Sequence, residues 1–296
     1  MEKILFIVNP IAGVRNNINM PDIISQNIDE QKYNFDIAFT QYAGHAKKIA
    51  ADAVEQSYDV IVAVGGDGSV NEIASQLVHK NVTLGIIPLG SGNGLALKMG
   101  LSKVQKKAMQ TINQGITKQI DVLKMNNDFV FSNAGVGFEG QVIEHFEKTK
   151  TRGLKEYMRI YIQQVFNYKP FKVKIKTDTQ TLEKEVFTLN FTNSGQYGYN
   201  IGYAPDAKLD DGFFELCIVN NFARWQIPFF FLMCIFNKQH WLKNLTVFKT
   251  KTATISTPEP YYAQLDGDSI QKNNHIKVQI LPQALRVIVP PEKALT

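Results

Sequence analysis

Short apolar runs alternate with segments of helical spacing up to residue 114, and this alternation is the strongest constraint on the fold. The apolar runs occupy 3–10, 33–40, 59–66 and 83–93. The segments with helical spacing occupy 45–56, 69–78 and 104–114. Strands that are apolar almost throughout are buried on both faces, which is typical of parallel sheets. We therefore predict an open parallel sheet covered by helices.

The pattern changes near Asp121, where strand-like runs separated by turn residues begin to dominate. Helical stretches around 141–167 and 223–237 interrupt these runs. Many short strands at close spacing are typical of a β-sandwich. The prediction is therefore the α/β class, with an N-terminal open-sheet domain over 1–121 and a C-terminal β-sandwich domain over 122–296. A return of the last residues to the first domain stays open.

Composition excludes several classes of function. The net charge of +5 suits anionic partners, but no Lys/Arg stripe is interleaved with aromatic residues, so we expect no nucleic-acid partner. Cys217 and Cys234 lie outside any zinc-binding spacing. The N-terminus lacks the features of a signal peptide, and the apolar run 227–236 is too short to span a bilayer. A cytoplasmic protein is the expectation.

The stretch VAVGGDGSVNE, residues 62–72, joins an apolar strand to a helix through three glycines and Asp67. Backbone N–H groups at such a turn are accessible, and the helix N-terminus adds partial positive charge, so the stretch can cradle a phosphate. A carboxylate there would repel a phosphate unless a cation lies between them or the carboxylate handles a proton. An ordinary tight turn, with Asp67 near a helix N-cap, is the alternative.

Three more polar or glycine-rich stretches end predicted strands: NPIAG at 9–13, Thr40 just before YAGHA, and PLGSGNGLA at 88–96. The carboxyl ends of parallel strands meet at one edge of an open sheet, which is where such sheets bind ligands. The sequence therefore predicts a ligand site built from these loops and from the 65–68 turn.

These stretches carry a family resemblance. The sequence resembles the diacylglycerol kinase catalytic-domain family, which includes bacterial lipid kinases, sphingosine kinases and ceramide kinases. The GGDG element also occurs in NAD kinases and phosphofructokinases, but without the later elements. The matching elements run in family order: NPIAG, Thr40, GGDGSVNE, PLGSGN, APDAKLDDGFF at 204–214 and DGD at 266–268.

The resemblance implies a nucleotide-binding domain, a β-sandwich substrate domain and an active site in the cleft between them, with ATP and Mg²⁺ as cofactors. The residues that it places at ATP are Asn9, Pro10, Gly13, Thr40, Gly65, Gly66, Asp67, Gly68, Ser69, Asn71, Glu72, Gly90, Ser91, Gly92 and Asn93.

Two carboxylates are candidates for the catalytic base. In bacterial members a Glu in an Asp-Gly-Glu triplet is assigned as proton acceptor, and it aligns with Asp268, which is one methylene shorter. In sphingosine kinases the role is given to the aspartate that matches Asp67. Phosphoryl transfer needs a carboxylate near the acceptor hydroxyl, and either residue suits that need.

The resemblance also implies two further sites. By position, Asp211 with the carbonyl groups of Lys208 and Phe213 would hold a structural Mg²⁺, although KLDDG without the family is an ordinary acidic turn. Asp121 matches a position that joins a magnesium–water network or contacts the substrate head group. An ordinary strand aspartate at a domain crossover is the alternative for it.

We therefore expect an ATP-dependent lipid kinase that visits the membrane surface peripherally and phosphorylates a hydroxyl of a lipid such as diacylglycerol or a sphingoid base. GSGNGLA is closer to the sphingosine and ceramide kinase form, so the acceptor stays open. The rivals are a kinase of a soluble acceptor, as in NAD kinases, and a non-catalytic nucleotide- or lipid-binding relative. The run 224–236 is either core or, if exposed, a lipid-facing surface. A homodimer is also left open.

Overall fold

The computed structural model describes residues 1–13, 19–149, 154–195 and 202–294. The expected helical stretch 141–167 includes 150–153, which lie outside the described residues. The chain divides into two compact units: residues 1–122 with 283–296, and residues 123–282. Both boundaries fall inside strands, one in β5 (Thr117–Met125) and one in β13 (Asp268–Ile288).

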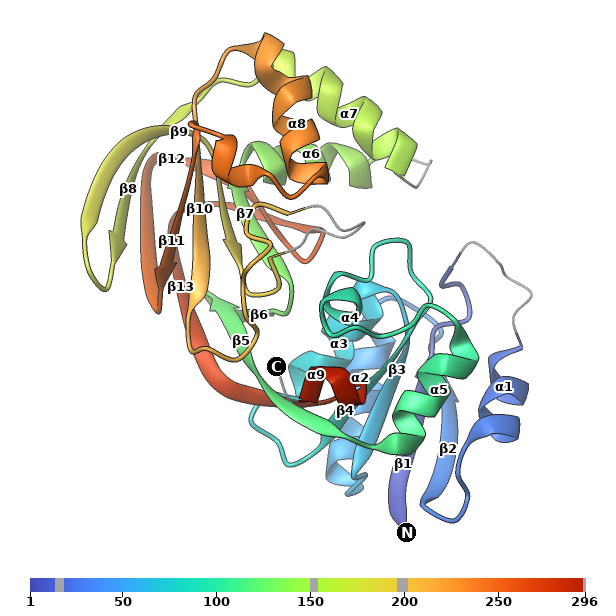
Figure 1. Ribbon diagram of the computed structural model, residues 1–296. Coiled ribbons are helices and arrows are strands. Elements are labelled where there is room, and N and C mark those ends of the chain that lie inside the picture. Colours follow the sequence, from blue (N-terminus) through green and yellow to red (C-terminus); the bar gives the residue numbers. More distant parts are fainter. Residues whose placement is uncertain (14–18, 150–153, 196–201, 295–296) are drawn as a thin grey trace. The chain divides into compact units, whose positions relative to one another are not determined.

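The first unit contains a parallel sheet, which confirms the predicted α/β pattern (Figure 1). The strands follow the order β2 (Tyr33–Phe39), β1 (Glu2–Val8), β3 (Val60–Gly65), β4 (Thr83–Pro88) and the end of β13. The helices of this unit are α1 (Met20–Asn27), α2 (His45–Glu55), α3 (Asp67–Leu77), α4 (Gly94–Lys98), α5 (Gln105–Gln114) and α9 (Pro291–Ala294).

Helices cover both faces of this sheet. Side chains alternate between the faces of a strand, so Ile4, Phe6 and Val8 share one face of β1. They belong to a buried cluster that also contains residues of α1 and α5. Helices α2 and α3 pack against each other and contact β1 and β3. Because both faces are buried, strands such as β3 have no exposed residue, as the apolar runs predict.

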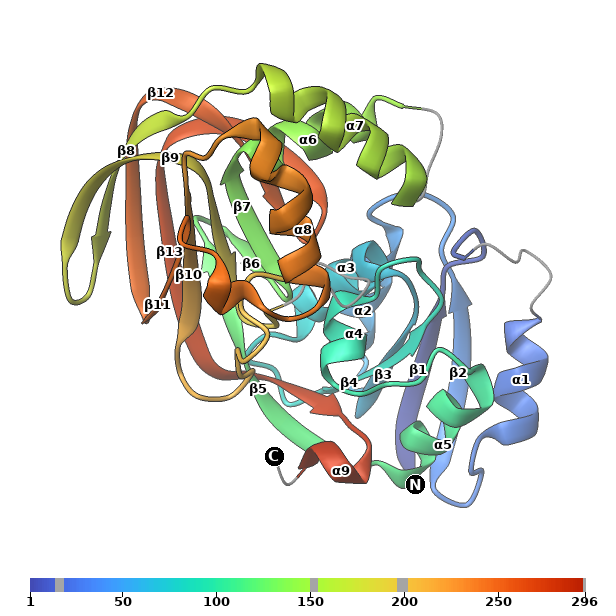
Figure 2. The same ribbon diagram turned by 45° about the horizontal axis from the view of Figure 1, so that its top comes forward.

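The second unit is built from antiparallel strands, with helices gathered over one face (Figure 2). Strands β7 and β8 each pair with both β9 and β12, along different halves of these longer strands. Its strands are β6 (Asp128–Val130), β7 (Asn133–Gly137), β8 (Phe171–Thr177), β9 (Thr181–Thr192), β10 (Phe214–Asn220), β11 (Leu245–Thr250), β12 (Thr252–Leu265) and most of β13. Its helices are α6 (Phe138–Glu147), α7 (Leu154–Asn167), η1 (Arg224–Gln226), α8 (Ile227–Ile235) and η2 (Gln239–Trp241).

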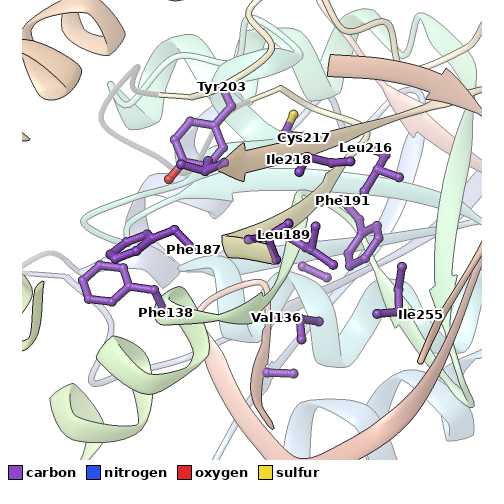
Figure 3. Packing of buried hydrophobic residues seen from close by; sticks show 14 of the residues in the cluster. Val136, Phe138, Phe187, Leu189, Phe191, Tyr203, Leu216, Cys217, Ile218 and Ile255 are labelled. Carbon is purple, nitrogen blue, oxygen red and sulfur yellow. The ribbon is translucent and has the colours of Figure 1, made fainter. Parts of the chain in front are cut away.

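The core of the second unit joins the strands to the helices. Figure 3 shows Phe138 at the start of α6 beside Phe187 of β9, with ring centroids 4.6 Å apart. Strand β8 alternates strictly, with buried Val173 and Ile175 between exposed lysines, because only one face of it meets this core. Cys217 and Cys234 are both buried and unoxidised, as expected of apolar core residues.

Candidate active site

The polar and glycine-rich loops of the first unit lie along one edge of its sheet, as predicted. Val8, the last residue of β1, pairs with Phe39 at the end of β2 and with Val64 near the end of β3. Gly65 pairs in turn with Pro88 at the end of β4. The loops that follow these strands therefore emerge side by side, at the ligand-binding edge of an open α/β sheet.

The two glycine-rich loops touch through their backbones. A Cβ atom on Gly90 would lie 2.6 Å from Cα of Gly66, and one on Gly66 would lie 3.2 Å from Cα of Gly90. A side chain at position 90 would clash with the backbone of the other loop, so glycine is required there, and a Cβ atom at position 66 would be unusually close. The result is an open backbone surface beside the N-terminus of α3, which suits a bound phosphate.

Asp67 ties the first glycine-rich loop to the second. Its Oδ2 accepts a hydrogen bond from the Asn93 backbone N–H at 2.7 Å, and its Oδ1 accepts one from the Gly94 N–H at 2.7 Å. Burial raises the pKa of the Asp67 carboxyl, and the two backbone hydrogen bonds oppose that rise. The carboxylate thus has a structural partner at each oxygen, which the sequence did not predict.

Asn93 supports the same arrangement from within the second loop. Its backbone has a φ of 58°, and its buried side chain accepts from the Gly90 N–H at 2.9 Å and donates to the Gly90 carbonyl at 2.5 Å. Asparagine tolerates this left-handed backbone better than most residues because its short amide bonds locally. The GSGN element therefore closes on itself and fixes the shape of the loop.

Two further hydrogen bonds connect the remaining strand ends. Asn9 Nδ2 donates to Ser69 Oγ at 3.1 Å, which joins the loop after β1 to the start of α3. Glu72 Oε1 accepts from the Gly44 N–H at 2.8 Å, which joins α3 to the loop after Thr40. All four loops are thus bonded to neighbours, and the edge is preorganised for a ligand.

A pocket of about 510 Å³ opens beside these loops in the first unit. This volume is in the range of small-molecule and cofactor sites. Of the residues predicted to contact ATP, the described lining contains Asn9, Pro10, Gly13 and Gly90. The others belong to the adjoining loops and to α3: Thr40, Gly65, Gly66, Asp67, Gly68, Ser69, Asn71, Glu72, Ser91, Gly92 and Asn93.

Sequence reasoning missed other residues of the pocket. The half-exposed Phe39 offers an aromatic face, and the exposed Lys103 offers a positive charge. Phe39 could have been found, because it precedes Thr40 at the predicted strand end. Lys103 carries no local signal, since it follows α4 in a segment without a motif.

Asp268 lies in the second unit, at the first position of β13, and its side chain is exposed. It pairs with Leu265 across a two-residue turn whose residues, Asp266 and Gly267, have φ values of 48° and 96°. Positive φ at both positions is the geometry that Asp-Gly hairpins favour. The DGD element therefore presents Asp268 at the end of a rigid hairpin.

Asp266 is a positioning residue that the sequence prediction left without a role. Its carboxylate accepts hydrogen bonds from the backbone N–H groups of residues 131–133, at 2.8 to 3.0 Å. The buried Gln264 accepts from the Gly267 N–H at 2.9 Å and donates to Asn133 Oδ1 at 2.7 Å. These contacts fix the hairpin against the loop before β7 and so hold the backbone of Asp268.

Asp121, the predicted substrate residue, is only 2% exposed in β5. Its Oδ1 accepts from the backbone N–H of Gln283 at 2.8 Å, where β13 re-enters the first unit. Gln283 has a φ of 49°, so the aspartate stabilises a strained residue of that strand. The structure thus gives Asp121 a structural partner, and its contact with a substrate stays a prediction.

One of the predicted magnesium ligands, Asp211, pairs with a lysine. Asp211 Oδ2 lies 2.6 Å from Lys249 Nζ, and Asp211 Oδ1 accepts from the Phe213 N–H at 3.1 Å. Lys249 also lies 3.8 Å from the buried Glu215, its direct cross-strand partner. Across the described residues, no three acidic, His or Cys side chains group as metal ligands. The Lys249 ammonium therefore competes with any cation for the Asp211 carboxylate. The magnesium site that Asp211 would form with the Lys208 and Phe213 carbonyls stays a prediction.

We expect Lys249→Met to lower the free energy of unfolding by about 1–2 kcal/mol, since it leaves two carboxylates without their shared cation. At about 2–4 °C per kcal/mol for a chain of this size, the melting temperature should fall by several degrees. MgCl₂ should stabilise this variant but leave the wild type unchanged. Thermal unfolding without nucleotide measures both, with the exposed Lys176→Met as the control. An equal rise in the melting temperature of the wild type with MgCl₂ would support the predicted magnesium site.

Two models of known protein families match the chain, one over most of the first unit and one over most of the second. Residues 3–125 match the model of the diacylglycerol kinase catalytic domain, and residues 132–289 match that of the YegS C-terminal NAD kinase beta sandwich-like domain. The chain is therefore a two-domain kinase-type protein. It belongs to the diacylglycerol kinase family, and the predicted resemblance and the β-sandwich are confirmed.

Similar proteins extend over almost the whole chain. A diacylglycerol kinase of Bacillus subtilis is 25% identical over 99% of this chain and 98% of its own length. One of Staphylococcus saprophyticus is 27% identical over 92% and 93%. A solved diacylglycerol kinase structure from Bacillus anthracis superposes with a TM-score of 0.73, at 22% identity and 98% coverage of both chains. An NAD kinase from Archaeoglobus fulgidus, at 10% identity, 99% and 96% coverage and a TM-score of 0.57, shares the fold alone.

Proposed function

We propose that this protein is an ATP-dependent lipid kinase, with diacylglycerol as the first acceptor to test. The observation that carries the proposal is the joined pair of glycine-rich loops, bonded through Asp67 beside a pocket lined by Asn9 and Lys103. This site offers what a nucleotide triphosphate needs: backbone N–H groups, a helix N-terminus and a positive side chain. The Mg²⁺ that accompanies ATP is part of this co-substrate.

In the proposed reaction, Asp268 accepts the proton of the lipid hydroxyl as the oxygen attacks the γ-phosphorus of ATP. The new oxygen–phosphorus bond forms while the bond to the bridging β–γ oxygen breaks, and ADP leaves with that electron pair. An exposed carboxylate on a rigid hairpin suits this role. Asp67 stays the alternative base, and the backbone hydrogen bonds that its two oxygens accept give it a structural role as well.

Relatives support a lipid acceptor over a soluble one. Two relatives that match over more than 90% of both chains bear the name diacylglycerol kinase, whereas the NAD kinase likeness is one of fold alone. A non-catalytic relative is the remaining rival, since Asp268 is shorter than the family's glutamate. Phosphorylation of any acceptor would exclude this rival.

Incubation with labelled ATP and a panel of acceptors tests the proposal: diacylglycerol, monoacylglycerol, sphingosine, ceramide and NAD. We expect a labelled phospholipid from one lipid class and no labelled NAD. Heat-denatured protein serves as the blank for each acceptor. Labelled NAD alone would place the protein with soluble-acceptor kinases, and ATP binding without any product would favour a non-catalytic relative.

A further inference from the structure

Helix α8 is apolar on two faces. In the described residues no helix combines the length and the apolar character that crossing a bilayer requires. One face of α8 packs into the core of the second unit through Ile227, Phe230, Met233 and Cys234, all buried. A helix that is apolar all round is normally buried completely or in contact with lipid.

The second face of α8 is exposed. Trp225, Phe229, Leu232 and Phe236 are 79%, 49%, 47% and 62% exposed. Phe229 and Leu232 lie on α8, and Trp225 in η1 and Phe236 just after α8 continue the spacing of three to four residues, so the four form one stripe. Trp241 in η2 is 60% exposed. Exposed aromatic residues gathered in this way mark interaction surfaces more often than isolated ones do.

The segment of chain that carries this stripe has basic residues but no acidic ones. Residues 216–258 contain no Asp or Glu, and their basic residues are Arg224, Lys238, Lys243, Lys249 and Lys251. Lys238 and Lys243 are exposed and follow α8 directly. At the other end, Arg224 Nη2 donates to the Tyr168 carbonyl at 2.5 Å, next to the exposed Lys169. Basic residues therefore lie near both ends of the apolar stripe.

We propose that this surface, defined by Trp225, Phe229, Leu232, Phe236 and Trp241, docks on an anionic lipid bilayer. Aromatic side chains at the level of the head groups, with lysines beside them, are the composition that interfacial helices use. The basic residues near both ends of the stripe supply the charge complementarity that such a membrane requires. The inference rests on the proposed function, because docking would bring the kinase to its acceptor.

Fluorescence can test this surface directly, since the two tryptophans of the chain, Trp225 and Trp241, both lie in it. Vesicles of equimolar phosphatidylcholine and phosphatidylglycerol should shift the emission to shorter wavelength, and bromolipids should quench it. The Trp241→Phe variant should still show the shift in emission, because Trp225 remains as the fluorophore. Vesicles of phosphatidylcholine alone, or high salt, should weaken the response. Unchanged emission with anionic vesicles would overturn the proposal.

Co-sedimentation with the same vesicles separates docking from other occupants. The double variant Phe229→Gln and Phe236→Gln should bind at least roughly tenfold more weakly, whereas Val247→Gln, an exposed apolar residue of β11, should bind like wild type. Equal binding by both variants would contradict the proposal. A wild-type protein that is dimeric without lipid, together with a double variant that is monomeric, would also contradict the proposal. The stripe would then contact a second copy of the chain.

Activity distinguishes this inference from the proposed function. On a water-soluble short-chain diacylglycerol the double variant should match the wild type, and on acceptor presented in anionic vesicles it should be at least roughly tenfold less active. Vesicle binding by a protein that phosphorylates no lipid would retain the docking surface and reject the kinase proposal. Equal activity of both proteins on vesicle-borne acceptor would reject docking as the route to substrate.

Discussion

Replacing Asp268 by Asn should lower kcat about 10²–10⁴-fold, the usual contribution of a positioned general base. The amide cannot accept the proton of the acceptor hydroxyl. Because the side chain is exposed and the hairpin is held by Asp266 and Gln264, folding should be unaffected. Steady-state kinetics with whichever lipid of the acceptor panel is phosphorylated, together with calorimetric titration of ATP, measures the effect. ATP affinity should stay at the wild-type value.

Two further variants make this prediction specific. Asp268→Glu, which restores the longer side chain of the bacterial relatives, should keep measurable activity. The exposed Asp128→Asn in the same unit should behave like wild type. Full activity of Asp268→Asn would remove this residue from the chemistry and return the base role to Asp67.

Replacing Asp67 by Asn should disturb binding and stability rather than proton transfer alone. The carboxylate accepts from the N–H groups of Asn93 and Gly94, and an amide can accept from only one of them. Hydrogen bonds to charged groups contribute about 1.5–3 kcal/mol each, so we expect a loss of that size in the free energy of unfolding. The second glycine-rich loop should move, and ATP affinity should fall roughly tenfold or more.

Calorimetric titration with ATP and thermal unfolding of the Asp67→Asn variant test this expectation. Asp52→Asn, an exposed aspartate on α2, is the control. A variant that binds ATP normally, melts at the wild-type temperature and is nevertheless inactive would contradict the structural role and support Asp67 as the base. Loss of Asp268 should thus change kcat, whereas loss of Asp67 should change ATP affinity and the melting temperature.

The fold follows closely from local patterns. The sequence predicts the burial of β3 from its continuous apolar run and that of β8 from its strict alternation. Both predictions hold because strand side chains alternate between the faces of a sheet. The order of the strands within the sheets does not, since it depends on pairings between distant segments. Strand β13 illustrates this: its end pairs with β4, far earlier in the chain.

The candidate site was predictable to the extent that its residues lie at strand ends. Glycine-rich loops can be recognised in the sequence, whereas the hydrogen-bond partners of side chains such as that of Asp67 cannot. Asp266 appears in the sequence as a turn residue, yet it binds backbone N–H groups up to 135 positions away. Lys249 is 38 positions from Asp211 and carries no motif, so the occupation of that carboxylate could be found only in the structure.

Strand β13 has a consequence for how the protein is made. Its residues Arg286 and Val287 pair with Thr83 and Leu84 of β4, and so extend the sheet of the first unit from the far end of the chain. The ribosome makes β4 first, then the residues of the second unit, and only then the end of β13. One edge of β4 therefore stays unpaired until β13 has been made. Completion of the first sheet thus depends on the synthesis of the second unit.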